Sequence, residues 1–132
     1  MKPRRRHVDA ARALSDCPRG DIAPLLATKT GAVMPFDQEQ DLDTPTGARL
    51  KLYTRRPPEA PRAVVQINHG LAEHAARYAR FADFLAGHGI ATVAHDHRGH
   101  GHTRAPDAPP RVFSTDGDGG AKVISDVAAV HD

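Results

Sequence analysis

Two short apolar runs on either side of a helical pattern most constrain how this chain can fold. Ala63–Ile67 and Ile90–Ala94 are short, nearly continuous apolar segments, which is typical of buried parallel strands. Between them, His74–Ala86 has helical spacing, and a glycine at position 87 or 89 can end the helix. Its expected apolar face consists of Tyr78, Phe81, Ala82 and Leu85. A strand, a helix and a strand of this length predict a right-handed βαβ crossover and a parallel sheet.

The segments around this unit extend the pattern. Arg49–Arg56 alternates Leu50 and Leu52 with polar positions and Tyr53, the period expected of a half-buried antiparallel strand. From Met34 the predicted order is strand, strand, strand, helix, strand, loop and helix. The last helix is expected from the spacing of Val123, Ile124, Val127 and Val130. The predicted fold class is α/β, with a mostly parallel sheet and an antiparallel first hairpin.

Length and charge bound what the chain can be. With 132 residues, 39% hydrophobic and 26% charged, it has the composition of a soluble globular protein and the length of one domain at most. Since α/β folds routinely use about 200 to 250 residues, we expect the amino-terminal portion of a larger, truncated domain. The formal charge of +2 gives nucleic-acid binding little support.

The cysteine content and hydropathy suggest a location. Cys17 is the single cysteine, so no disulfide forms within the chain and a reducing, cytoplasmic setting is expected. The basic start is followed by further charges rather than the apolar run of a secretory signal. No segment approaches the roughly 20 apolar residues of a membrane-spanning helix. We expect no integral membrane segment, and the oligomeric state is left open.

Composition changes near Met34. Residues 1–33 mix charges with glycine and proline, which predicts a flexible extension or a wrongly assigned start. Residues 34–132 carry the α/β pattern, so Met34 is an alternative to Met1 as the first residue.

The loop after the first apolar strand offers an oxyanion site. Open α/β sheets bind ligands at the carboxyl edge of their strands, and His69, Gly70 and Leu71 follow such a strand. Gly70 permits close backbone approach, so the Leu71 amide can point at a developing oxyanion, with His69 and Gly70 shaping the turn. The alternative for the His-Gly dipeptide alone is a simple strand-to-helix turn.

Four histidines lie in the loop after the second apolar strand, at positions 95, 97, 100 and 102. Imidazole suits zinc, copper and nickel, but the spacing fits neither an HxHxDH nor an HxxEH zinc frame. Asp116-Gly117-Asp118 begins like a calcium loop, yet the following positions do not continue the pattern. We expect no metal and no cofactor. The alternative left open is a non-catalytic α/β module that binds a ligand or metal through residues 95–102.

HGLAEHAARY at His69–Tyr78 and HDHRGHG at His95–Gly101 resemble a known family. Their order and separation are similar to those of the monoacylglycerol lipase and lysophospholipase branch of the α/β-hydrolases, also catalogued as serine aminopeptidase-like hydrolases. The resemblance covers residues 41–132. It implies an α/β-hydrolase fold with helices on both faces of the sheet, and a small-molecule ester or lipid substrate in the full-length form.

The resemblance also implies roles for individual residues. Leu71 corresponds to the position that donates the oxyanion-hole amide. Two structural loops are implied, formed by Glu73, His74 and Arg77, and by Asp96, Arg98, Gly99, His100 and Gly101. Thr103 stands where many relatives have serine.

The catalytic triad is not found in the sequence. None of the three serines, at positions 15, 114 and 125, lies in the GxSxG frame of a nucleophile elbow. Ser125 has valines at the two positions where that elbow needs glycine. Since the chain order in this fold is Ser, Asp or Glu, then His, the resemblance implies a triad beyond residue 132. We expect a carboxylic ester hydrolase by family and an inactive fragment by itself.

Overall fold

The computed structural model describes residues 36–132. The extension predicted for residues 1–33, the alternative start at Met34 and the single cysteine, Cys17, lie outside these residues. Within them, no helix is long and apolar enough to cross a bilayer.

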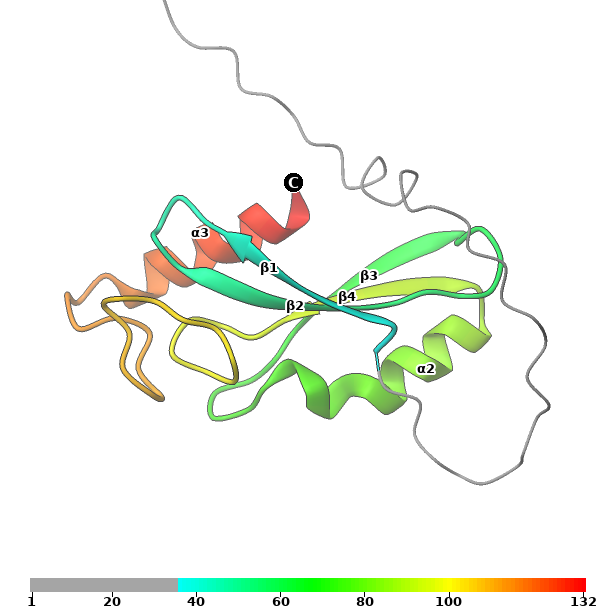
Figure 1. Cartoon of the computed structure of the whole chain (residues 1–132), viewed down its shortest axis with the longest axis horizontal. Helices are drawn as coiled ribbons and strands as arrows, with labels where there is room; N and C mark the ends of the chain where they lie inside the picture. The colour runs from blue at the N-terminus through cyan, green and yellow to red at the C-terminus, as the bar shows by residue number, and fades with distance from the viewer. Residues whose placement is uncertain (1–35) are drawn as a thin grey trace, which may run out of the picture.

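The strands form one mixed sheet in the order β1-β2-β4-β3 (Figure 1). They are β1 (Gln38–Asp43), β2 (Arg49–Arg55), β3 (Ala63–Asn68) and β4 (Ile90–His95). β1 pairs with β2 and β2 with β4 in antiparallel fashion, whereas β3 and β4 are parallel. The predicted antiparallel hairpin and the predicted parallel pair joined through a helix are both confirmed.

Both faces of β2 are covered, which the sequence pattern did not predict. Leu50 and Leu52 are buried on one face, where Val130 of the last helix packs against them. Tyr53 points the other way and is only 3% exposed, in a cluster with Ile67, Ala75 and Ala94. The half-buried strand expected for this segment was therefore wrong at Tyr53, because a second layer of structure covers that face.

β3 lies at the edge of the described sheet and is less buried than its apolar composition indicated. Ile67 is buried, but Val64 is 50% exposed. Within residues 36–132, β4 is the only strand that pairs with β3. The prediction of a fully buried strand was wrong for its first half, since an apolar run identifies a strand but not the number of its neighbours.

The helix after β3 begins with a tighter turn than predicted. A 3-10 turn, η1 (Ala75–Tyr78), leads into α2 (Ala79–Gly87). A 3-10 turn has about 3.0 residues per turn instead of about 3.6, so the positions before Ala79 are rotated relative to those in α2. Phe81 is 48% exposed, which corrects its placement in the core. The buried positions are Ala75, Ala82, Leu85 and Ala86.

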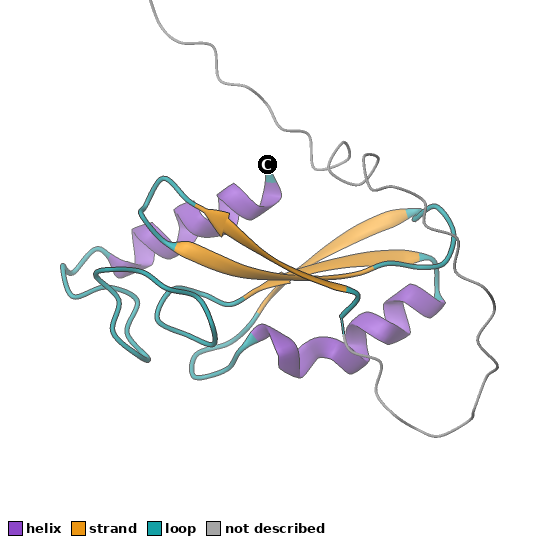
Figure 2. Cartoon of the chain, in the orientation of Figure 1, coloured by secondary structure: helices purple, strands orange, loops and turns teal. Residues whose placement is uncertain are grey.

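The last helix, α3 (Gly119–His131), covers the face of the sheet opposite to η1 and α2 (Figures 1 and 2). The helices on both faces implied by the resemblance are thus present. Ile124, expected on the apolar side, is 69% exposed, whereas Asp126 is buried. The long segment between β4 and α3 is irregular, apart from a single bridge between Arg49 and Arg104.

Candidate functional site

The loops after β3 and β4 leave the sheet side by side. Asn68 and His95, the last residues of the two parallel strands, are register partners. The two motifs that follow, beginning at His69 and Asp96, therefore start as neighbours at the carboxyl edge, where open α/β sheets bind ligands. The two loops, which the sequence placed after successive parallel strands, therefore lie together.

Asp96 joins the two loops to β2. Its side chain is fully buried. Oδ1 accepts a hydrogen bond from the Ala75 amide at 2.7 Å, and Oδ2 accepts bonds from the His102 amide at 2.8 Å and the Tyr53 hydroxyl at 3.1 Å. Burial, together with the carboxylate, raises the pKa of Tyr53. A buried carboxylate needs such donors, so Asp96 fixes the start of η1 relative to its own loop.

The glycines of this loop are needed for both backbone angle and space. Gly99 and Gly101 adopt left-handed φ values of +72° and +52°, which favour glycine. A Cβ on Gly99 would lie 2.1 Å from the Val112 carbonyl oxygen. Backbone angle therefore favours glycine at both positions, and the close approach of Val112 also excludes a side chain at Gly99.

Three buried histidines connect the loops through a chain of hydrogen bonds. The His97 amide donates to His69 Nε2 at 2.9 Å, and His97 Nε2 lies 3.2 Å from the His69 carbonyl oxygen. His95 Nε2 lies 3.1 Å from His97 Nδ1. Burial lowers the pKa of His95 and of His97 to about 4, and also lowers the pKa of His69. All three rings are neutral near pH 7.

Glu73 organises the turn that carries Leu71. Glu73 Oε2 accepts hydrogen bonds from the Tyr78 hydroxyl at 2.7 Å and from the Gly70 amide at 3.4 Å. Arg77 pairs with the other carboxylate oxygen at 3.5 Å. The Tyr78 hydroxyl bond is the main reason that the pKa of Glu73 lies below its ordinary value. Glu73 thus contacts the turn directly, and Arg77 contacts Glu73.

His74 takes no part in these contacts. It precedes η1 with extended backbone angles and forms no side-chain cap hydrogen bond. It is exposed and lies beside Glu73 on the rim of a groove.

Leu71 is an exposed residue in the loop after β3. The residue is 78% exposed, and its N–H donates to no acceptor within the part of the chain that the structure describes. The next residue, Ala72, has a left-handed φ of 63°, which is strained for a residue with a Cβ. Ala72 lines a groove of about 250 Å³, as does Arg111, the other non-glycine residue with a positive φ among the described residues.

Arg98 and His100 lie beneath the loop surface. Arg98 is fully buried and donates to Asp107 at 2.5 Å, with Asp126 of α3 at 3.8 Å. Asp126 accepts further hydrogen bonds from the Thr44 and Thr46 hydroxyls at the β1–β2 turn. His100 donates from Nδ1 to the Arg98 carbonyl at 3.0 Å. These contacts connect the loop after β4 to α3 and the first hairpin.

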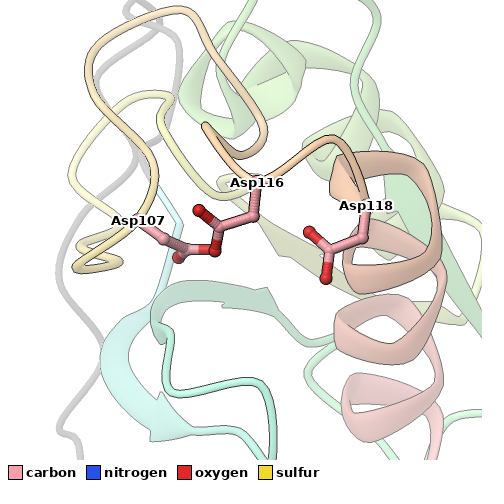
Figure 3. A group of neighbouring side chains, drawn as sticks. All are labelled: Asp107, Asp116 and Asp118. Carbon is pink, nitrogen blue, oxygen red and sulfur yellow. The ribbon is translucent and has the colours of Figure 1, made fainter.

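An acidic cluster lies between this loop and α3. Asp107, Asp116 and Asp118 have carboxylates close enough to hold a cation, and no other such group occurs within residues 36–132 (Figure 3). The ammonium of Lys122 already contacts all three, at 2.6, 3.3 and 3.0 Å. These bonds, led by the one from Lys122, lower the pKa of Asp107 to about 2. The cluster is a surface ion-pair network.

Two of the three serines lie in the described residues. Ser114 Oγ bonds to Asp107 and Asp118, both at 3.0 Å, and Ser125 is exposed on α3. Neither forms a hydrogen bond with a ring nitrogen in residues 36–132. Ser15 lies outside the described residues.

Sequence reasoning gave no positioning role to four residues that hold the site together: Tyr53, His95, His97 and Asp126. For Asp126 a signal existed. It stands three residues after Val123 and four before Val130, so it falls on the apolar stripe of α3, where a carboxylate needs a buried partner. For the role of His97 no local signal existed, because its partner His69 follows another strand.

Comparison with known proteins finds relatives for this part of the chain. The profile of the family described as serine aminopeptidase, S33 matches residues 59–130. Monoglyceride lipase from Homo sapiens is 33% identical over 73 residues, which is 55% of this chain and 24% of that protein. Monoacylglycerol lipase from Mycolicibacterium smegmatis is 44% identical over 55 residues, 42% of this chain and 20% of that protein. The chain thus spans about a quarter or less of these relatives.

A solved structure that superposes with a TM-score above 0.5 agrees on the fold. Epoxide hydrolase VrEH1 from Vigna radiata superposes with a TM-score of 0.53 and 22% identity over 70% of this chain and 27% of its own. A thermostable carboxyl esterase from Bacillus coagulans has a TM-score of 0.47 and 34% identity over 52% of this chain and 22% of its own.

Proposed function

Because the chain belongs to the serine aminopeptidase S33 family of α/β-hydrolases, we propose that it forms the amino-terminal part, residues 34–132, of a serine hydrolase. The proposed reaction is hydrolysis of carboxylic esters of the monoacylglycerol or lysophospholipid type. The two lipases to which it is similar support that substrate class. The single cysteine supports a cytoplasmic location.

The observation that carries the proposal is the free amide of Leu71. It lies at the carboxyl edge of β3, with no acceptor in the described residues, on a turn held from both sides. Backbone amides held in place before the reaction stabilise the charge that develops on a tetrahedral intermediate. One such donor is worth about 2.7 to 4 kcal/mol. We assign Leu71 N–H as an oxyanion donor, with His69 and Gly70 shaping its turn.

The surrounding residues have supporting roles in the proposal. Glu73 and Arg77 hold the turn from the η1 side, and Asp96 holds it from the loop after β4. His74 belongs to the same loop by its position on the groove. Arg98, Gly99, His100 and Gly101 keep the second loop in shape. None of them is proposed as a nucleophile or general base.

The 132-residue chain is not proposed to be catalytic by itself. Its serines are not framed by the glycines of a nucleophile elbow. Ser125 is on a helix, where Val123 and Val127 take the glycine positions. An oxyanion donor without a nucleophile gives only residual catalysis. Activity therefore requires a nucleophile, an acid and a histidine that these residues do not supply.

The first experiment is to read the codons that follow residue 132 for a GxSxG-encoding stretch, and to express the protein with and without them. Cleavage of a p-nitrophenyl ester is expected only with the added segment. Leu71→Pro, which removes the N–H, should then lower kcat by about 10²- to 10³-fold. Leu71→Ala, which retains it, should change kcat little. Turnover by the 132-residue chain that survives Ser125→Ala but vanishes with Leu71→Pro would contradict the proposal that this chain lacks a nucleophile.

A further inference from the structure

We infer that His97 is a positioning residue, which holds the His69–Gly70 turn, and with it the Leu71 amide, through two reciprocal hydrogen bonds to His69. One bond runs from the His97 amide to His69 Nε2 at 2.9 Å, and the other joins His97 Nε2 to the His69 carbonyl at 3.2 Å. The two rings are 4.3 Å apart between centroids. Both residues are at least nine-tenths buried, so water does not compete for these bonds.

The backbone partners determine every tautomer. A backbone N–H can only donate and a carbonyl can only accept. His69 Nε2 faces the His97 amide and is therefore bare, so its proton is on Nδ1, which donates to the Gly70 carbonyl at 2.8 Å. His97 Nε2 faces the His69 carbonyl and carries the proton. His97 Nδ1 is then an acceptor.

His95 completes the arrangement. As the last residue of β4, it is fully buried, and its Nε2 lies 3.1 Å from His97 Nδ1. Because His97 Nδ1 is an acceptor, His95 donates from Nε2. The His97 ring is thereby held at both nitrogens, by His95 on one side and by the His69 carbonyl on the other. A ring fixed at both ends transmits the position of rigid β4 to the turn after β3.

The turn needs support at this point because one of its residues is exposed and the next is strained. Leu71 is exposed, and Ala72 has a left-handed φ, a strain that persists only where the surroundings hold it. Glu73, at the far end of the turn, accepts a hydrogen bond from the Gly70 amide. His97 holds its near end, two residues before Leu71. The structural role stands independently of the proposed function, and only its effect on catalysis rests on Leu71 being an oxyanion donor.

The test begins with the tautomers of the full ¹⁵N-labelled chain, read by long-range ¹H–¹⁵N correlation near neutral pH. The expected result is a proton on Nδ1 of His69 and on Nε2 of both His95 and His97. A proton on Nδ1 of His97, or averaged shifts typical of an unfolded chain, would overturn the inference. This measurement needs neither a substrate nor a variant, so its failure is distinct from failure of the hydrolase proposal.

Amide hydrogen exchange in variants separates positioning from general stability. His97→Gln retains a donor that can reach the His69 carbonyl, whereas His97→Leu leaves that carbonyl unpaired. We expect exchange of the Glu73 amide, which closes the turn by bonding to Gly70 O, to accelerate about tenfold in the Leu variant and to change little in the Gln variant. The Thr44 amide, bonded to Ala48 in the distant hairpin, should be unaffected.

Equal acceleration at both amides in His97→Leu, or the same loss in His97→Gln, would assign His97 to general stability and overturn the inference. His131→Leu, at an exposed position on α3, is the matched control and should leave the Glu73 amide unchanged. If His97→Leu does not fold, the wild-type tautomers and the Gln variant still decide the question.

Discussion

Oδ2 of Asp96 lies 2.1 Å from the point that a Cβ on Gly101 would occupy. The carboxylate fills this space because it is bonded to Tyr53, Ala75 and His102 at the same time. Gly101 has a left-handed φ of +52°, so both its backbone angle and its surroundings require glycine. The loop thus folds around the carboxylate of Asp96, its first residue, and this folding determines the spacing between Asp96 and Gly101.

Gly101→Ala should destabilise the protein strongly. An added methyl must displace Asp96 from its donors or open the loop, and overpacking of this kind costs about 1 to 3 kcal/mol, in addition to about 1 to 2 kcal/mol for the left-handed φ. We expect the free energy of unfolding, measured by urea titration, to fall by about 3 kcal/mol.

Gly117→Ala is the matched control for that variant. Gly117 has a φ of +80° and no atom within 4 Å of its would-be Cβ, so it carries the backbone cost without the clash. The free energy of unfolding of this variant should fall by only about 1 kcal/mol. Equal losses at the two glycines would show that Asp96 is not the obstacle.

Acid should weaken the fold through the buried histidines. The pKa of His95 and of His97 lies at about 4, below the ordinary value of 6.5. Between these values the unfolded chain binds protons that the native rings do not. The stabilisation is complete above about pH 6.5 and is lost as the pH falls toward 4, at up to about 1.4 kcal/mol per pH unit for each ring.

The pH effect can be separated from that of the carboxylates. The pKa of Asp107 falls from 3.8 to about 2, so its contribution is lost only at more acidic pH. Urea unfolding of the wild type at several pH values should show the decrease, and His97→Gln should make it shallower, whereas His131→Gln should not. A free energy of unfolding that is constant from about pH 7 to 5 would contradict the inference that the buried histidine rings are neutral in the folded protein.

Much of the fold could be predicted because its signals are local. The helical period between the apolar runs, together with their length, was sufficient to predict the parallel β3–β4 pair. Burial was less predictable. Tyr53 alternates with leucines and belonged by pattern to the open face, but η1 covers it. Phe81 fell on the predicted stripe and is exposed, because the buried stripe of α2 runs through Ala82, Leu85 and Ala86 and leaves Phe81 at its edge.

The residues of the candidate site were easier to predict from the sequence than the contacts between them. The glycines at 99 and 101 stood out in sequence, yet the atoms that exclude a side chain there come from Val112 and Asp96. The role of His97 was not predictable, because it depends on His69, 28 positions away, and on which nitrogen carries the proton. The spacing of HDHRGHG gave no indication of that hydrogen bond.

Added zinc should not stabilise the protein. Both ring nitrogens of His69 and of His97 are hydrogen-bonded, to the backbone or to another histidine, so neither ring can bind a metal without breaking such a bond. An ion bound at about 100 times its Kd would add about 2.7 kcal/mol to the free energy of unfolding. We expect no such rise in thermal unfolding with zinc, and no zinc in the purified chain. A rise abolished by His100→Gln would instead support the ligand- or metal-binding alternative.

Arg98→Met should be among the most destabilising single changes in the described residues. Arg98 is fully buried and is the nearby cation for Asp126, which is itself 1% exposed. Removing one partner of a buried ion pair typically costs about 3 to 5 kcal/mol, because the remaining charge stays buried without compensation. Asp126→Asn, which keeps an acceptor for Thr44, should cost less by itself. The double variant should then be more stable than the sum of the two losses predicts, by about 1 kcal/mol or more. Additive losses in urea unfolding would show that Arg98 acts through Asp107 alone, and that the 3.8 Å separation from Asp126 contributes no coupling.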